Sequence, residues 1–478
     1  MLWKTWMNIK SAPFTLWVLA FLLTAGLSTL IPPMMSPDES SHINRAYLIS
    51  QGTLLLQPLP QDALINSIQN SPVTANVATS QRRGGRVGGM IDAGLVEFTD
   101  NHLALLIQTD KRLTSTDQER LARITWTDKA SFIAFPGTGY YFPAIYTPQA
   151  VGLAIGQALH FGVAQSYHLA RAATLLICFS LLGWASTLWR PNSFVMAVLL
   201  LPMSLFQLMS PTIDGLSTSL AVLAIALFLW SADLKHKHLV RHSWGLAVCI
   251  VLIVTCRTHL LPLLLLPFFI AWKRHSRRDF YLGCFVAAIA TAWILFALQT
   301  TSDVRVIRQQ TSAELLLQYA TSPMAFLRVV LASLADAKLF TFYEQSFIGI
   351  LGWLDAPLPA YFYPILWSGL ALCATLSLSV STWRADWQTR LLLTTTSIAS
   401  VVLMFLALLV TWTPHPATVV QGVQGRYLVV PAILLGCSLS GFSAPDGPRR
   451  RRFVWVTVAG FMLFCLTALI MTLLRRYH

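Results

Sequence analysis

Long uncharged apolar stretches recur along this chain from one end to the other, and they constrain its fold more than any other feature. A stretch of about 18 or more such residues forms a helix that can cross a hydrocarbon layer about 30 Å thick. Of the 478 residues, 55% are hydrophobic and 11% are charged, whereas ordinary soluble domains have about 25% charged residues. The pattern predicts an all-α polytopic membrane protein. An outer-membrane β-barrel is excluded, because its strands would alternate apolar and polar residues.

The hydropathy pattern predicts eleven transmembrane helices. The first, at 13–33, exceeds the apolar core of a signal peptide, which has about 7–15 residues, so we expect a retained helix. The others are expected at 168–188, 194–209, 216–232, 243–256, 260–272, 280–300, 360–382, 391–412, 427–441 and 453–474. The chain then divides into the N-terminus with the first helix (1–33), a large extracytoplasmic loop (34–165), helices 2–7 (166–300), a second extracytoplasmic loop (301–359) and helices 8–11 (360–478).

The distribution of charge sets the expected orientation, with the N-terminus in the cytoplasm. Sixteen of the 34 basic residues fall in loops that this arrangement places inside, as the positive-inside rule requires. The segment 141–163 is expected to be re-entrant or interfacial, because a full span there would move Lys235–Arg241 outside. The stretch 324–350 is expected to form an amphipathic helix on the membrane surface. The net charge of +14 therefore serves topology, and no nucleic-acid partner is predicted.

An acidic segment follows the first predicted span. Asp38 and Glu39 are adjacent, and His42 and Arg45 follow within one or two helical turns. Burial and repulsion between like charges can raise the pKa of a carboxylate toward use as a general base. The alternative is an ordinary acidic start to a surface helix, and both interpretations can hold together.

Aromatic residues and prolines crowd the segment 135–149, which includes Tyr146. This composition is typical of an aromatic belt at headgroup depth. It also suits a platform for a sugar or a lipid headgroup, because a tyrosine offers both a stacking face and a hydroxyl group.

A few charged residues lie at the edges of the predicted spans. By the predicted topology, Asp214, Arg257 and Arg426 lie at the same outer membrane depth, and Arg171 begins a span there. Guanidinium groups suit a phosphate, because their fork of donors matches its oxygens. The alternative is a set of structural ion pairs, such as Asp214 with an arginine.

Other candidate motifs carry little chemistry. The run from Arg82 to Gly89 lacks the spacing of a phosphate-binding loop, so a mobile loop is expected. All seven cysteines lie in apolar segments, which argues against disulfides and thiolate metal sites. No paired-histidine metal motif is present. Asp38 and Glu39 could bind Mg²⁺ or Mn²⁺, although a metal-independent site is favoured.

The residues above resemble the bacterial membrane family catalogued as domain of unknown function 2142. Residues 37–46 match its signature of Pro-Asp-Glu, two residues, His, two residues and Arg-Ala. The further matches, in the same order, are Tyr146-Thr147-Pro148, Ser210-Pro211 with Asp214, Leu351-Gly352-Trp353-Leu354-Asp355 with Pro359, and Gln424-Gly425-Arg426-Tyr427. The resemblance covers nearly the whole sequence.

That family is similar to the GT-C superfamily of polytopic glycosyltransferases, which use polyprenyl-phosphate-linked sugars. The resemblance implies a GT-C-like bundle with Asp38 and Glu39 in the catalytic loop. Substrate contacts are expected from His42, Arg45, Tyr146, Asp214, Arg257, Gln424, Arg426 and Tyr427. The length of the first loop varies among such proteins, which leaves the acceptor open.

The leading hypothesis is inverting sugar transfer from a polyprenyl phosphate to a cell-envelope glycan on the outer face of the bacterial cytoplasmic membrane. Asp38 is the preferred base, and Glu39 is a second carboxylate or its replacement. The alternatives are a transporter or flippase for a lipid-linked glycan and an inert assembly partner. Transporters place their ionisable groups near the bilayer midplane, whereas the charges here are predicted at one face.

Overall fold

The computed structural model describes residues 12–58, 87–107, 110–301, 310–379, 383–440 and 448–478. Lys4 and Lys10, two of the sixteen basic residues expected inside, and residues 82–86 of the glycine-rich run lie outside the described residues. The α-helices are α2 (Ala12–Ser28), α3 (Glu39–Ser50), α6 (Ala93–Ile107), α7 (Ser115–Ala122), α8 (Thr147–Ala158), α9 (Val163–Leu188), α10 (Ser193–Leu200), α11 (Pro202–Met209), α12 (Ile213–Ala232), α13 (Val240–Val254), α14 (Leu265–Arg274), α15 (Arg277–Thr300), α16 (Ser312–Thr321), α17 (Pro323–Ala335), α18 (Ala337–Gly349), α19 (Phe362–Ser377), α20 (Trp383–Thr411), α21 (Val429–Ser440) and α22 (Pro448–Tyr477). Four 3-10 helices accompany them: η1 (Pro136–Tyr140), η2 (Pro143–Tyr146), η3 (Thr258–Leu264) and η4 (Gly425–Leu428).

The chain is a predominantly helical membrane protein, as the sequence predicts. Within the described residues, five helices are long and apolar enough to cross a membrane, and a sixth span results if the bent pair of α16 and α17 counts as one. The five are Val163–Leu188, Ile213–Ala232, Arg277–Thr300, Asp386–Thr411 and Arg449–Tyr477. The expected total of eleven spans is therefore not established by helix length.

The other expected spans coincide with helices that are short or broken. The segment 194–209 is split into α10 and α11, of eight residues each, because Pro202 cannot donate a backbone hydrogen bond. The segment 260–272 begins as the 3-10 helix η3, which contains Pro262. The first helix ends at Ser28 rather than at residue 33. A helix of 15 residues such as α13 rises only about 22 Å.

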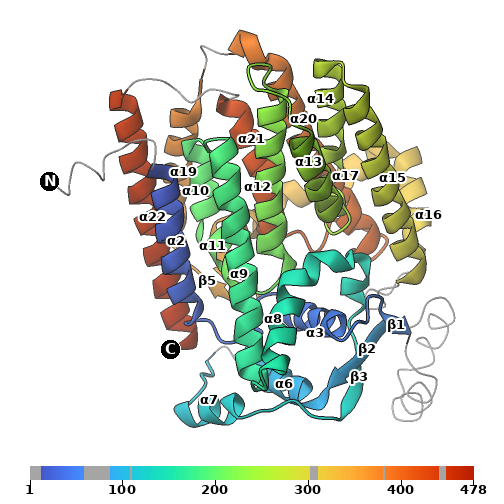
Figure 1. Ribbon diagram of the computed structural model, residues 1–478, viewed down its shortest axis with the longest axis vertical. Helices are drawn as coiled ribbons and strands as arrows, with labels where there is room; N and C mark the ends of the chain where they lie inside the picture. Colours follow the sequence, from blue (N-terminus) through green and yellow to red (C-terminus); the bar gives the residue numbers. More distant parts are fainter. Residues whose placement is uncertain (1–11, 59–86, 108–109, 302–309, 380–382, 441–447) are drawn as a thin grey trace.

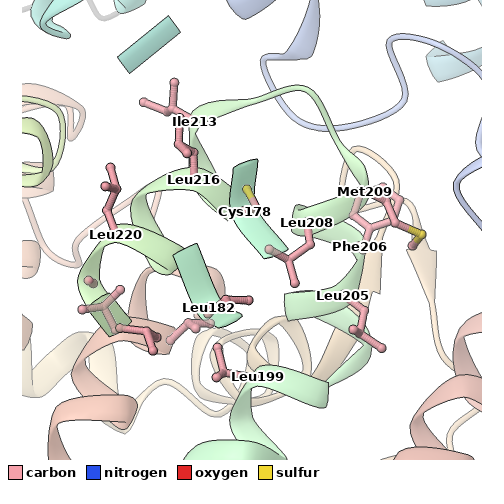
Figure 2. Close-up of a cluster of buried hydrophobic side chains, with 14 of the residues drawn as sticks. Cys178, Leu182, Leu199, Leu205, Phe206, Leu208, Met209, Ile213, Leu216 and Leu220 are labelled. Atoms are coloured by element: carbon pink, nitrogen blue, oxygen red, sulfur yellow. The ribbon is translucent and has the colours of Figure 1, made fainter. Parts of the chain in front are cut away.

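Helix α12 is the central helix of the bundle. Its apolar window is 94% buried, and it packs against α9, α13, α14 and α21. Figure 2 shows part of the surrounding core, where Leu216 and Leu220 of α12 lie near Cys178 and Leu182 of α9 and near side chains of α10 and α11. Because α12 is apolar on all sides, its position is set by burial, and it carries Asp214 in its first turn.

The polar segments gather at one end of the bundle. Figure 1 shows α3, α6, α7 and a small sheet at the bottom, whereas the turn from α14 to α15 lies at the top. The sheet is antiparallel in the order β1 (Gln57–Pro58), β2 (Val87–Asp92), β3 (Ala130–Ala134). A second pair, β4 (Ile350–Leu351) and β5 (Ala356–Pro357), forms a short hairpin.

Part of the glycine-rich run from Arg82 to Gly89 is a strand, which corrects the expectation of a mobile loop. Val87, Gly88 and Gly89 belong to β2; Gly88 and Gly89 pair with β3, and Val87 pairs with Pro58 of β1. A Cβ atom at Gly88 would lie 1.9 Å from the carbonyl oxygen of Ile133. The absence of a side chain therefore lets the two strands approach.

The segment 141–163 holds η2 and the 12-residue helix α8, which rises only about 18 Å. Helix α8 packs closely on α9, because Gly152 and Gly156 face it. A Cβ atom at Gly152 would lie 2.5 Å from the Cα atom of Ala170, and one at Gly156 would lie 2.3 Å from the hydroxyl of Ser166. Small residues four apart allow such close helix packing in membrane proteins.

The expected amphipathic helix at 324–350 is wrong as a single element, because the chain forms α17 and α18 there. Asp336 ends α17 and begins α18, and its side chain accepts hydrogen bonds from the backbone of Lys338 and Leu339. An aspartate that caps the next helix in this way stops the previous one. Apolar side chains of α16 and α17, among them Leu317 and Met324, remain exposed.

The predicted orientation can be tested by cysteine labelling. In a Cys284→Ala background, which removes the exposed native thiol, Ser115→Cys lies on α7 and Lys237→Cys lies in the turn between α12 and α13. We expect a membrane-impermeant maleimide to label Ser115→Cys in intact cells and Lys237→Cys only after lysis. Labelling of Lys237→Cys but not Ser115→Cys in intact cells would reverse the orientation.

Candidate functional site

Asp214 joins two arginines from distant parts of the chain. One carboxylate oxygen lies 3.0 Å from Nη1 of Arg426, and the other forms an ion pair with Arg257. The exposed fractions of the three side chains are 8%, 5% and 13% respectively. The three predicted membrane-edge residues therefore form one buried cluster, in which a carboxylate holds two cations. The structural ion pairs considered above are present.

Each member of this cluster is positioned by the breaks between helices. Thr212 caps α12 just before Asp214, and Gln149 of α8 donates to the carbonyl oxygens of Pro211 and Thr212. Arg257 lies between α13 and η3.

Arg426 lies in η4, directly after Gly425. A Cβ atom at Gly425 would lie 2.1 Å from the backbone nitrogen of Phe347, so only glycine permits this contact with α18. The hydroxyl of Ser346 accepts a hydrogen bond of 2.8 Å from the Gly425 amide. Helix α18 thereby fixes the backbone that carries Arg426.

Asp38 also lies next to Arg426. Its carboxylate lies 3.8 Å from Nη2 of Arg426, and 48% of the side chain is exposed. The left-handed backbone of Asp38, with φ of 59°, takes it out of the usual capping geometry, and its side chain makes no cap hydrogen bond to α3. Asp38 also lines a cavity of about 120 Å³ together with His42 and Tyr141. Asp38 is thus a carboxylate next to Arg426 that solvent can still reach.

Glu39 points elsewhere and is completely buried. Its oxygens accept hydrogen bonds from the backbone of Met34, at 3.1 Å, and Ser36, at 2.9 Å. Tyr167 donates to it, and Arg171 lies 3.9 Å away. Burial raises the pKa of Glu39, and Arg171 and the hydrogen bonds oppose that rise.

Arg171 is therefore separated from the Asp214 cluster, which corrects the expectation that it lies with Asp214, Arg257 and Arg426. It donates to the carbonyl oxygens of Ser28, at 2.8 Å, and Ile31, at 2.9 Å, and so stabilises the end of α2. Together with Glu39, it holds both ends of the turn between α2 and α3. The two adjacent acids therefore differ: Glu39 fixes this turn, and Asp38 is presented to the cavity.

His42 and two tyrosines form the aromatic side of the cavity region. Nδ1 of His42 lies 2.8 Å from the hydroxyl of Tyr146, and its ring stacks on Tyr141 with centroids 6.0 Å apart. Burial, with help from Arg257 and Arg426, lowers the pKa of His42 to about 3. Burial likewise raises the pKa of Tyr141 to about 12. Both rings are neutral at physiological pH and offer hydrogen bonds and stacking faces.

Of the other residues predicted to contact substrate, Tyr427 lies beside the arginine cluster, whereas Arg45 lies away from it. Arg45 is 1% exposed and donates to the carbonyl oxygen of Leu54, on the side of α3 away from solvent. Tyr427 lies beside the arginine cluster, and its hydroxyl accepts a 3.4 Å bond from Arg426. The guanidinium carbons of Arg426 and Arg257 lie 5.3 and 5.9 Å from its ring centroid. Gln424 precedes η4, and its side-chain oxygen is buried.

Some important residues were not chosen from the sequence. Tyr167 bridges Glu39 and Arg171, and it carried no sequence signal because it lies in an apolar helix. The sequence indicates Trp353 only as part of the motif at 351–355. Its indole nitrogen donates a hydrogen bond of 3.1 Å to the carbonyl oxygen of Met34, so Trp353 supports the turn before Asp38. Asp355, from the same motif, pairs with Arg476 at 2.7 Å and serves the fold.

A divalent metal has no evident site at the acidic pair. Both oxygens of Glu39 are engaged with Met34, Ser36 and Tyr167, and Asp38 faces Arg426 instead. Among the residues that the structure describes, no group of three or more His, Cys, Asp or Glu side chains is placed to hold a metal ion. The two carboxylates therefore do not converge as ligands of one cation.

The match to a family model covers most of the chain. The model for the predicted membrane proteins called DUF2142 matches residues 21–436. The chain belongs to this family. No curated protein and no solved structure matches the chain. The DUF2142 match includes Asp38, Asp214, Arg257 and Arg426, so the residues of this site all lie within the family's shared region.

The different environments of the two acids predict different effects on stability. Glu39→Ala leaves the buried charge of Arg171 without its carboxylate partner and is expected to lower the free energy of unfolding by about 3–5 kcal/mol. Asp38→Asn removes a half-exposed pair and should change it by less than about 1 kcal/mol. Unfolding of the purified variants in detergent measures both changes in the free energy of unfolding. Glu97→Ala, at an exposed position on α6, is the control. Equal losses for Glu39→Ala and Glu97→Ala would contradict the assignment of Glu39.

Proposed function

We propose that this DUF2142 protein is a GT-C-like glycosyltransferase that moves a sugar from a polyprenyl-phosphate donor to a cell-envelope glycan. The proposal includes the full set of eleven spans and reaction at the outer face of the bacterial cytoplasmic membrane, with the N-terminus inside. The observation that carries it is the placement of Asp38: a half-exposed carboxylate at a cavity, within 3.8 Å of an arginine that belongs to a buried two-arginine cluster.

In the proposed reaction, Asp38 is the general base. A hydroxyl of the acceptor glycan gives its proton to a carboxylate oxygen of Asp38 while the hydroxyl oxygen attacks the anomeric carbon of the donor sugar. The new glycosidic bond forms as the bond from that carbon to the phosphate oxygen breaks, with inversion at the carbon. The proton on Asp38 then passes to solvent, which reaches this side chain.

The arginine pair suits the leaving group. Negative charge develops on the polyprenyl phosphate as its bond to the sugar breaks, and guanidinium groups held in place before the reaction stabilise it without reorganisation. Arg426 and Arg257 are fixed by Asp214, and the polar side chains of Tyr427 and His42 adjoin them. Glu39 takes no chemical step in this scheme, because it holds the turn that presents Asp38.

The aromatic surfaces suit a sugar ring. Tyr141 and Phe135 line the cavity next to Asp38, and carbohydrate rings pack their apolar C–H faces against aromatic side chains. Neutral His42 and the hydroxyl of Thr138, also at this cavity, provide hydrogen-bonding groups for sugar hydroxyls. The cavity is therefore the proposed place of the acceptor or the transferred sugar, next to the base.

Replacement of the base is expected to abolish the reaction. Asp38→Asn should reduce sugar transfer by about 10²–10⁴-fold while the protein inserts and accumulates normally. Mass spectrometry of envelope glycans, compared between cells with the wild-type and variant proteins, measures the effect. Asp100→Asn, an exposed carboxylate on α6, is the matched control. Full modification by Asp38→Asn would remove Asp38 from the role of base and leave a transporter or flippase as the better hypothesis.

The substitution Arg426→Lys distinguishes two roles of Arg426, a contact with the donor phosphate and a structural ion pair. Lysine keeps the charge but lacks the fork that reaches Asp214 and Asp38 together, so we expect the fold to survive and transfer per folded molecule to fall by about 10–100-fold. Arg123→Lys, at an exposed pair, is the control. A fully active Arg426→Lys protein would mean that Arg426 only neutralises Asp214.

A further inference from the structure

A second cavity lies between α10, α19 and α22, near the start of α22 and thus at the end of the bundle opposite α6 and α7 (Figure 1). Its volume is about 50 Å³, and Arg190 and Arg451 both line it. This end also carries the basic segment at the start of α22, Arg449–Arg452. The cavity shares no residue with the cluster around Asp214.

Among the residues that the structure describes, the two arginines at this cavity have no carboxylate partner. Among the described residues, no Asp or Glu oxygen lies within 4.0 Å of Arg190 or Arg451, and neither side chain makes a hydrogen bond within that part of the chain. Arg450 differs, because it donates to the carbonyl oxygens of Leu376 and Leu378. Both cavity arginines are half-buried, so two partly desolvated cations adjoin one small space.

The side chains of Asn192 and Ser193, which also line the cavity, already have hydrogen-bond partners within the protein. Asn192 donates to the carbonyl oxygen of Gly436 and to Ser440, and it accepts from the backbone of Val195. The hydroxyl of Ser193 bonds to Cys373 and Ser377. The guanidinium groups are therefore the polar groups left to recognise a ligand, and that ligand is an anion.

The walls of the cavity are apolar, and exposed apolar side chains of α22 lie beside them. Met196, Leu376 and Val458 line it, and Trp455 contributes an indole ring. On α22, the neighbouring side chains of Phe453 and Val456 are 55% and 66% exposed, as expected of a helix face in contact with acyl chains. A small anion gains nothing from contact with apolar walls, whereas the acyl chain of a lipid is stabilised by them. Tryptophan is typical of headgroup depth.

We propose that this cavity binds one anionic phospholipid, with its phosphate between Arg190 and Arg451 and its acyl chain along α19 and α22. A space of about 10–15 Å³ holds one water-sized group, so about 50 Å³ accommodates the four oxygens of a phosphate. Basic pockets between membrane helices recognise lipid headgroups through this combination of charge and apolar surface. The proposal is independent of the sugar-transfer site.

Native mass spectrometry of the full chain in neutral detergent tests the site. We expect one tightly held phosphatidylglycerol, with phosphatidylcholine and inorganic phosphate bound much more weakly. Arg190→Gln combined with Arg451→Gln should weaken this binding at least about tenfold. The control Arg241→Gln combined with Arg449→Gln removes two exposed charges from the same end and should leave it nearly unchanged. Leu376→Trp fills the cavity without changing charge and should also prevent binding.

Three results would overturn the proposal. Equal weakening by the cavity pair and the control pair would indicate nonspecific attraction to a basic surface. Binding of inorganic phosphate as tight as that of phosphatidylglycerol would indicate a free-anion site. Unchanged lipid binding by Leu376→Trp, in protein that unfolds at the wild-type temperature, would place the lipid elsewhere.

Discussion

The buried carboxylate of Asp214 is the constraint on which the end of the bundle that carries α3 and the small sheet depends. A charge removed from water must be paired, and breaking such a pair costs far more than the pair contributes. Asp214 binds Arg257 and Arg426, so it holds the start of α12, the break after α13 and η4 at one point. The two guanidinium groups then act on their surroundings: they help to keep His42 neutral, and Arg426 faces Asp38. One ion-pair cluster thus organises both the packing of three segments and the electrostatics of the cavity.

The acidic segment shows how neighbouring residues acquire different properties from the same fold. Glu39 begins α3 and turns inward to Tyr167 and Arg171, where it fixes the turn after α2. Asp38, one residue earlier, has a left-handed backbone and points to the cavity. Trp353 supports the same turn from a distant segment. The proposed general base must be held rigidly and still be reached by its substrate, and this division between the two acids suits both requirements.

The sequence predicted the class of fold and the convergence of Asp214, Arg257 and Arg426, because unpaired charges are rare at membrane depth and must meet partners. It did not separate Arg171 from that cluster, since charge and depth alone do not specify which carboxylate an arginine will meet. It also predicted one helix at 324–350, where Asp336 divides α17 from α18. Tyr167 gave no signal, because a tyrosine within an apolar helix looks the same whether it bridges two ions or fills space. Long-range contacts of single side chains lie beyond what periodicity and composition encode.

The central claim is that the cluster around Asp214 binds the phosphate of a lipid-linked sugar beside Asp38. Its most direct test is a cryo-electron microscopy structure of the full chain in a lipid nanodisc with a polyprenyl phosphate sugar added. We expect density for the phosphate within hydrogen-bond distance of Arg426 or Arg257, and for the sugar in the cavity lined by His42 and Tyr141. An occupied lipid site elsewhere, with this cavity holding only water, would contradict the account.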